Sequence, residues 1–373
     1  VDASRRRGPG ARVLLIVPAA ALLLLGIDAG LVLLGVPMPV IFERLPELHA
    51  PLLVFGFLGT LISLERAVAL RAAWAHSAPA LLAAGALVTL TPLPVIVGKA
   101  IVVCGLTVHL FQYRAIWMRQ PMTATAVQGL GAASGLTAAL AWCGGVPPAH
   151  LVPMFAAFLV LTIVGERLEL ARVAAPGIRA ERTLFAIAST FALAALLSLV
   201  VPAIAIPVAG LGLVSMVGWL LRYDIARVTV RREGLPRYIA VCLLVGYGWL
   251  LVAGVGWILG GAQSEGPLYD ATTHAIFLGF VITMVMAHAP LILPAVLGVT
   301  IPYHLALYVP VALLQAALLT RVVGGDAWGN IVALRVGGIG AAVAMLLFAA
   351  TVVTVSLRAR RAPDRKKLHD VAA

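Results

Sequence analysis

Residues 49–66 read HAPLLVFGFLGTLISLER: a histidine, fifteen residues without a charge, and then the pair Glu65–Arg66. At 1.5 Å rise per residue, about 20 mostly apolar residues cross the hydrocarbon core of a bilayer as an α-helix. The stretch therefore predicts a transmembrane helix, with His49 near one membrane surface and Glu65 near the other.

Eleven further stretches have a similar length and apolar character, so the sequence predicts an all-α polytopic membrane protein with twelve transmembrane helices. Proline-containing segments set the breaks between the third and fourth helices and between the seventh and eighth. We expect residues 1–373 to form a single transmembrane domain that ends in a basic cytoplasmic tail over 357–373. The predicted spans are 12–36, 49–70, 78–97, 98–117, 122–144, 149–170, 183–201, 203–222, 237–260, 271–296, 302–320 and 331–356.

The composition excludes several classes of protein. Of the 373 residues, 62% are hydrophobic and 11% are charged, whereas a soluble domain is about half apolar and about a quarter charged. A soluble enzyme, a disordered protein and a nucleic-acid-binding domain are therefore excluded. The partner that this composition indicates is the lipid bilayer.

The basic residues predict the orientation in the membrane. If the N-terminus is cytoplasmic, 23 of the 27 Lys and Arg residues fall on the cytoplasmic side, and the four on the outer side are Arg44, Lys99, Arg321 and Arg335. Cytoplasmic loops of membrane proteins are enriched in Lys and Arg. We therefore expect a multi-pass protein of a bacterial inner (plasma) membrane with both termini in the cytoplasm, and the net charge of +12 reflects its loops.

The second, sixth and tenth predicted helices share a pattern. Each begins with a histidine at the outer surface, and a Glu-Arg pair follows 16 residues later in the first two of them. The histidines are His49, His150 and His274, and each interval between them holds four helices. The chain is therefore predicted to contain three pseudo-repeats, roughly 12–117, 122–222 and 237–356; the alternative is a chance recurrence.

Three histidines at one membrane level indicate a cofactor or metal site. Ionisable groups within spans are costly and tend to mark function, and histidine is a common ligand of metals and of haem iron. His49 and His274 are predicted to clamp one haem iron, and His150 is a candidate to hold copper or line a nearby pocket. The alternative for each is an interfacial histidine bonded to a loop carbonyl.

Other polar residues fit around this pair. Asp270 precedes His274 by one helical turn and would accept the second ring N–H, or it would cap the helix N-terminus. Arg321 and Arg335 are candidates to bind haem propionates. Arg335 would alternatively pair with Asp28 in the first helix.

The opposite ends of these helices are also polar. His288 is a candidate ligand of a second metal or haem, or an ordinary residue of the inner interface. The pairs Glu65–Arg66 and Glu166–Arg167 are expected to snorkel to water, with proton entry through the glutamates as the alternative.

Twelve helices, a threefold repeat and histidines in helices two, six and ten resemble subunit I of the haem–copper oxidases. The resemblance implies that helices two and ten supply haem ligands and that Arg321 and Arg335 bind propionates. The sequence departs from that family because its tenth helix has one outer histidine instead of an HxH pair, and its seventh helix has none. An oxygen-reducing or proton-pumping oxidase is therefore not expected.

The stretch from Thr273 through His274-AIFLGFVITMVMAHAP resembles the NnrS family of twelve-helix membrane proteins, which contain haem and copper and are linked to nitric oxide tolerance. The second-helix HxH of that family reads Leu48-His49-Ala50 here. The resemblance implies a role in the response to nitric oxide or another diatomic gas.

The sequence thus favours a membrane haem protein with one b-type haem near the outer face, and the resemblances add copper as a second cofactor. Its role would be a response to a diatomic gas or electron transfer with a redox partner. An oxidoreductase activity is compatible with either role. The alternatives are a transporter without a cofactor and a membrane assembly factor. Nucleic acid is not an expected partner.

Overall fold

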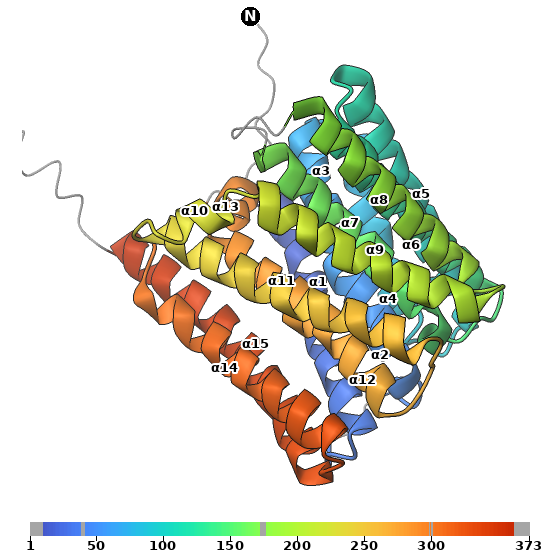
Figure 1. The fold of residues 1–373 in the computed structure, drawn as a ribbon. Helices are drawn as coiled ribbons and strands as arrows, with labels where there is room; N and C mark the ends of the chain where they lie inside the picture. The colour runs from blue at the N-terminus through green and yellow to red at the C-terminus, as the bar shows by residue number, and fades with distance from the viewer. Residues whose placement is uncertain (1–9, 39–41, 172–176, 298, 300, 362–373) are drawn as a thin grey trace, which may run out of the picture.

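The computed structural model describes residues 10–38, 42–171, 177–297, 299 and 301–361, and this part of the chain is helical and contains no strand (Figure 1). Eleven of its helices are long and apolar enough to cross a membrane. The protein is therefore a multi-pass membrane protein, as the composition predicts.

The first half of the chain runs as follows. Short 3-10 turns at Pro46–Leu48, Trp74–His76 and Pro148–Leu151 lead into the second, third and sixth spans. The helices are α1 (Gly10–Leu33), the continuous span α2–η2–α3 (His49–Pro51, Leu52–Gly59, Thr60–Leu70), α4 (Ser77–Val88), α5 (Val95–Arg119), α6 (Thr123–Cys143) and α7 (Val152–Ala171).

The second half continues the bundle. Its helices are α8 (Gly177–Leu197), α9 (Pro202–Tyr223), the short α10 (Ala226–Thr229), α11 (Leu235–Gly260), the span α12–η6–α13 (Pro267–His274, Ala275–Ile282, Thr283–Leu297), the span η7–α14–η8 (Leu305–Leu307, Tyr308–Leu319, Thr320–Ala327) and α15 (Ile331–Arg361). In Figure 1, α14 and α15 form a pair at one edge, and α5, α6, α8 and α9 gather at the other.

The third predicted span, 78–97, is shorter in the structure than predicted. The apolar helix there is Trp74–Val88, which is shorter than a typical span, and the next helix begins at Val95. The segment between them contains Pro92 and Pro94, and proline lacks the N–H that a continuing helix needs. The last helix extends to Arg361, past the predicted start of the tail, whose residues 362–373 lie outside the described structure.

The second, sixth and tenth predicted helices form the centre of the bundle. The most apolar windows of these three spans are 61%, 78% and 61% buried, against at most 56% in the other eight. In α7, every residue from Val152 to Gly165 is buried. A helix that is apolar all round and buried on every side belongs in the core.

In the described part of the chain, three segments are wound as π-helix, which the sequence does not predict. They are η2, η6 and η8. The first two begin three residues after His49 and one residue after His274, and the third contains Arg321. π-helical turns are rare and are frequent at functional sites.

Candidate functional site

His49 is held against α1 by one specific contact. Its Nδ1 lies 2.8 Å from the carbonyl oxygen of Gly26, so Nδ1 carries the proton and donates it. Gly30 permits this approach, because a Cβ at that position would lie 2.6 Å from Cε1 of His49. The lone pair is therefore on Nε2, for which the described residues supply no hydrogen-bond partner.

His274 is held in the same way at the end of α12. Its Nδ1 lies 2.9 Å from the backbone oxygen of Asp270 and 3.3 Å from Asp270 Oδ1. Nε2 is again without a partner among the described residues. The His49 imidazole lies within electrostatic range of His274, Arg321 and Asp270, so helices distant in the sequence place the two histidines in one polar region.

Asp270 binds Arg321 through both carboxylate oxygens. Arg321 Nε and Nη2 each lie 2.7 Å from one of them, and the arginine side chain is 7% exposed. The expectation that Asp270 caps α12 was wrong, because the N-cap is Gly266, which has no side chain to form a cap bond. A second carboxyl group, that of Asp326, lies against Asp270 and Arg321.

Arg335 does not form the predicted pair with Asp28. Its Nε donates to the backbone oxygen of Leu34 at 3.1 Å, and its side chain is exposed. Both carboxylate oxygens of Asp28 are buried and have no partner in the described residues.

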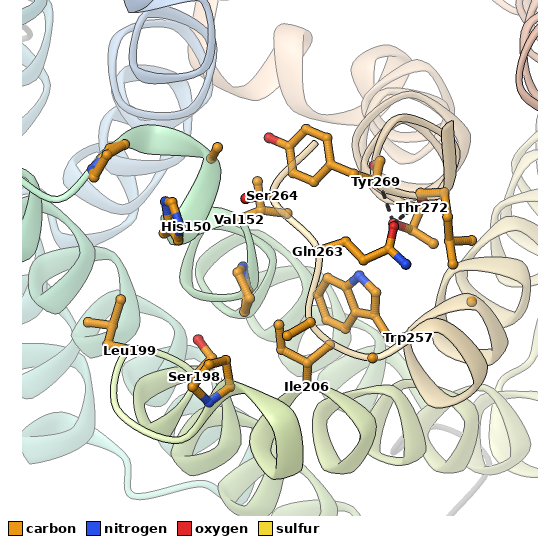
Figure 2. Close-up of a pocket in the computed structure, with 18 of the residues that line it drawn as sticks. His150, Val152, Ser198, Leu199, Ile206, Trp257, Gln263, Ser264, Tyr269 and Thr272 are labelled. Atoms are coloured by element: carbon orange, nitrogen blue, oxygen red, sulfur yellow. Dashed lines mark hydrogen bonds between the residues drawn. The ribbon is translucent and has the colours of Figure 1, made fainter. Parts of the chain in front are cut away.

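His150 stands apart from the other two histidines. It is exposed and lines a separate pocket of about 410 Å³, between the start of the sixth span and the segment after α11. Figure 2 shows Ser198, Gln263, Ser264 and Tyr269 around the same space. The pocket has no second His, Cys, Asp or Glu in its lining, and the described residues contain no group of three or more such side chains arranged to hold a metal.

At the opposite end of the same helices, the Glu-Arg pairs are not solvated. Arg66 Nη2 lies 2.7 Å from Oε1 of both Glu65 and Glu166, and the arginine side chain is 12% exposed. The expectation that these pairs snorkel to water was wrong, because each arginine contacts a carboxylate from another part of the chain: Glu166 of α7 for Arg66, and Asp224 at the end of α9 for Arg167.

Arg167 makes the most buried ion pair of this end. Its Nε and Nη2 lie 2.7 and 2.8 Å from the two carboxylate oxygens of Asp224, which also accept from the Tyr247 hydroxyl and the Ala226 N–H, each at 2.8 Å. His288 Nε2 lies 3.4 Å from Arg167 Nη1, and its Nδ1 donates to Met284 O. His288 is thus part of a charged network, with both ring nitrogens engaged.

A cavity of about 550 Å³ lies between these two ends. It is bounded by α1, α3, α7, α13 and α15, and Glu65, Glu166 and His288 are at its polar end. On the second span its lining begins at Phe57 and on the tenth at Val281, roughly two helical turns beyond His49 and His274.

No curated protein matches the sequence. A family model described as a domain of unknown function, DUF8744, matches residues 12–357. The match runs from α1 to the C-terminal part of α15 and includes both histidines and both ends of the cavity. The chain therefore belongs to the DUF8744 family.

Proposed function

We propose that the protein binds one b-type haem between His49 and His274 and acts in electron transfer or in the response to nitric oxide or another diatomic gas. The observation that carries the proposal is the matched state of the two imidazoles. Each donates Nδ1–H to a backbone oxygen, at 2.8 and 2.9 Å, and each leaves Nε2 free.

This arrangement fits what haem iron requires. A metal-bound histidine usually donates its second ring N–H to a carbonyl or carboxylate, which fixes the tautomer and the ring orientation. His49 has Gly26 as that acceptor, and His274 has Asp270.

The cations near the pair suit the propionates. Arg321 uses Nε and Nη2 on Asp270 and keeps Nη1, while Arg335 uses Nε on Leu34 and keeps both terminal nitrogens. Haem bound here would supply one-electron redox chemistry or a site for a diatomic gas. His49 and His274 would hold the iron, and the free nitrogens of Arg321 and Arg335 would bind the propionates.

We also propose that the bundle consists of three units of four helices, shares its origin with the NnrS and oxidase folds, and lies in the bacterial inner membrane with both termini cytoplasmic. The burial of the second, sixth and tenth spans supports the three-unit organisation. Copper is not included, because His150 has no second ligand-type side chain in its pocket.

The test is the absorption spectrum of protein purified in detergent after expression with ample haem. We expect a Soret band whose intensity falls at least tenfold in His49→Ala and in His274→Ala, and which His150→Ala leaves unchanged. A wild-type protein without a Soret band, or equal haem content in all four proteins, would remove the proposal.

Asp28 favours a second candidate function, transport without a cofactor. A carboxylate whose two oxygens are buried in a span without a partner is costly and is typical of an ion or substrate path. The test is uptake of a labelled substrate or of protons into proteoliposomes that contain the protein without haem. Uptake that Asp28→Asn abolishes would support this function instead.

A further inference from the structure

The 550 Å³ cavity has the shape and chemistry of a site for a long apolar molecule. Its lining extends along α15 from Met345 to Leu357, which is about 18 Å at the α-helical rise. The side walls are aliphatic, aromatic or thioether groups such as Leu23, Phe57 and Met284. Pockets of 300–1,000 Å³ with apolar walls and few polar groups are typical of small-ligand sites.

The polar end offers hydrogen-bond acceptors. Glu65 and Glu166 both use Oε1 on a single nitrogen of Arg66, and no partner for either Oε2 occurs among the described residues. Their side chains are 26% and 19% exposed, although they lie within a buried network. His288 has no ring nitrogen left to offer, because Nδ1 and Nε2 are both engaged.

These features define the occupant. Two carboxylates share one guanidinium group, so the end carries surplus negative charge, and a group that donates hydrogen bonds would relieve the cost of burying it. We infer that the cavity binds a hydroquinone with a long apolar tail, whose hydroxyls donate to Oε2 of Glu65 and Glu166. The choice of a hydroquinone among protic head groups rests on the proposed function, because a haem within the membrane needs an electron donor that dissolves in the same apolar phase.

The first test compares three probes under anaerobic conditions, by equilibrium dialysis against the full-length protein in detergent. They are a benzohydroquinone with a ten-carbon tail, its oxidised quinone, and its dimethyl ether. A hydrogen bond to a charged group contributes about 1.5–3 kcal/mol, which is about tenfold to a hundredfold in affinity. The hydroquinone should therefore bind at least tenfold more tightly than the other two, which have no O–H to donate.

The second test uses paired variants. Glu166→Gln removes a charged acceptor at the cavity, and Glu169→Gln changes an exposed glutamate of the same helix. Ala349→Phe fills the cavity from α15, and Ala350→Phe places the same ring at the adjacent exposed position, which is not part of the lining. We expect at least tenfold weaker hydroquinone binding in the first member of each pair and unchanged binding in the second.

The inference fails if binding is not saturable, if the quinone and its dimethyl ether bind as tightly as the hydroquinone, or if the paired variants behave alike. It also fails if dodecylamine displaces the hydroquinone at equal concentration, because the site would then accept any protic amphiphile. Two variants separate the two sites. Hydroquinone binding should persist in a His49→Ala, His274→Ala double variant, and haem binding should remain normal in Ala349→Phe. Failure of one proposal would then leave the other standing.

Discussion

The Arg167–Asp224 pair gives the sharpest stability prediction. The two side chains are 3% and 1% exposed and share two bonds of 2.7 and 2.8 Å. Replacing Asp224 by leucine leaves the guanidinium buried and unpaired, which costs about 3–5 kcal/mol. The Tyr247 hydroxyl also loses an acceptor, at about 1 kcal/mol. The free energy of unfolding should therefore fall by about 4 kcal/mol or more.

The double variant Arg167→Met, Asp224→Leu separates the pair from its packing. Because exchanging a whole buried ion pair for apolar side chains is often close to neutral, it should be at least about 2 kcal/mol more stable than Asp224→Leu alone. The exposed Arg114 gives the matched control, and Arg114→Met should change stability by less than about 0.5 kcal/mol. Reversible unfolding in mixed micelles, followed by tryptophan fluorescence, measures all four proteins. A double variant no more stable than the single one would refute the reasoning.

Three further predictions follow from the histidine pair and the topology. Gly30→Ala should displace the His49 ring and lower haem content several-fold in the Soret assay, whereas Gly218→Ala, with open space around it, should not. Asp270→Asn should lower the free energy of unfolding by about 1.5–3 kcal/mol, because it weakens the bonds to Arg321. It should also broaden the haem spectrum by loosening His274. Unchanged thermal unfolding and unchanged spectra would contradict this prediction. A fluorescent protein fused to the C-terminus should fold in the cytoplasm, and an active periplasmic phosphatase fusion there would reverse the orientation.

The spans were predictable because lipid leaves the chain little choice. Every backbone polar group must be satisfied within the segment, so a long apolar run becomes a helix. The third span was predicted too long because the apolar character continues through Pro92 and Pro94 and hides the end of α4. Composition alone places a helix there but does not show where proline ends it.

At the site, local spacing was more informative than residue type. The four-residue interval predicted that Asp270 and His274 meet, since one helix fixes it, and their side chains lie 3.3 Å apart. The ring N–H donates to the backbone oxygen of Asp270 at 2.9 Å, however, and the carboxylate binds Arg321. Arg66 contacts Glu166 of α7, and Arg167 contacts Asp224 at the end of α9. A sequence does not give the rotation and depth of one helix against another, so the arginines were predicted to reach water, although these carboxylates hold them in the protein.

The π-helical segments distinguish the two polar ends of the bundle. The charged network joins α-helical residues of α3, α7, α11 and α13 to Asp224, which directly follows α9. Within it, Arg167, Asp224 and Tyr247 bond to one another. At the histidine end, by contrast, η2 and η6 closely follow His49 and His274, and η8 carries Arg321. An uncommon backbone form beside two imidazoles with unused nitrogens indicates a geometry kept for binding. The Arg167–Asp224 pair is satisfied by bonds within the protein, whereas the two imidazoles each keep an Nε2 without a partner among the described residues. This contrast is the reason to propose the haem at His49 and His274.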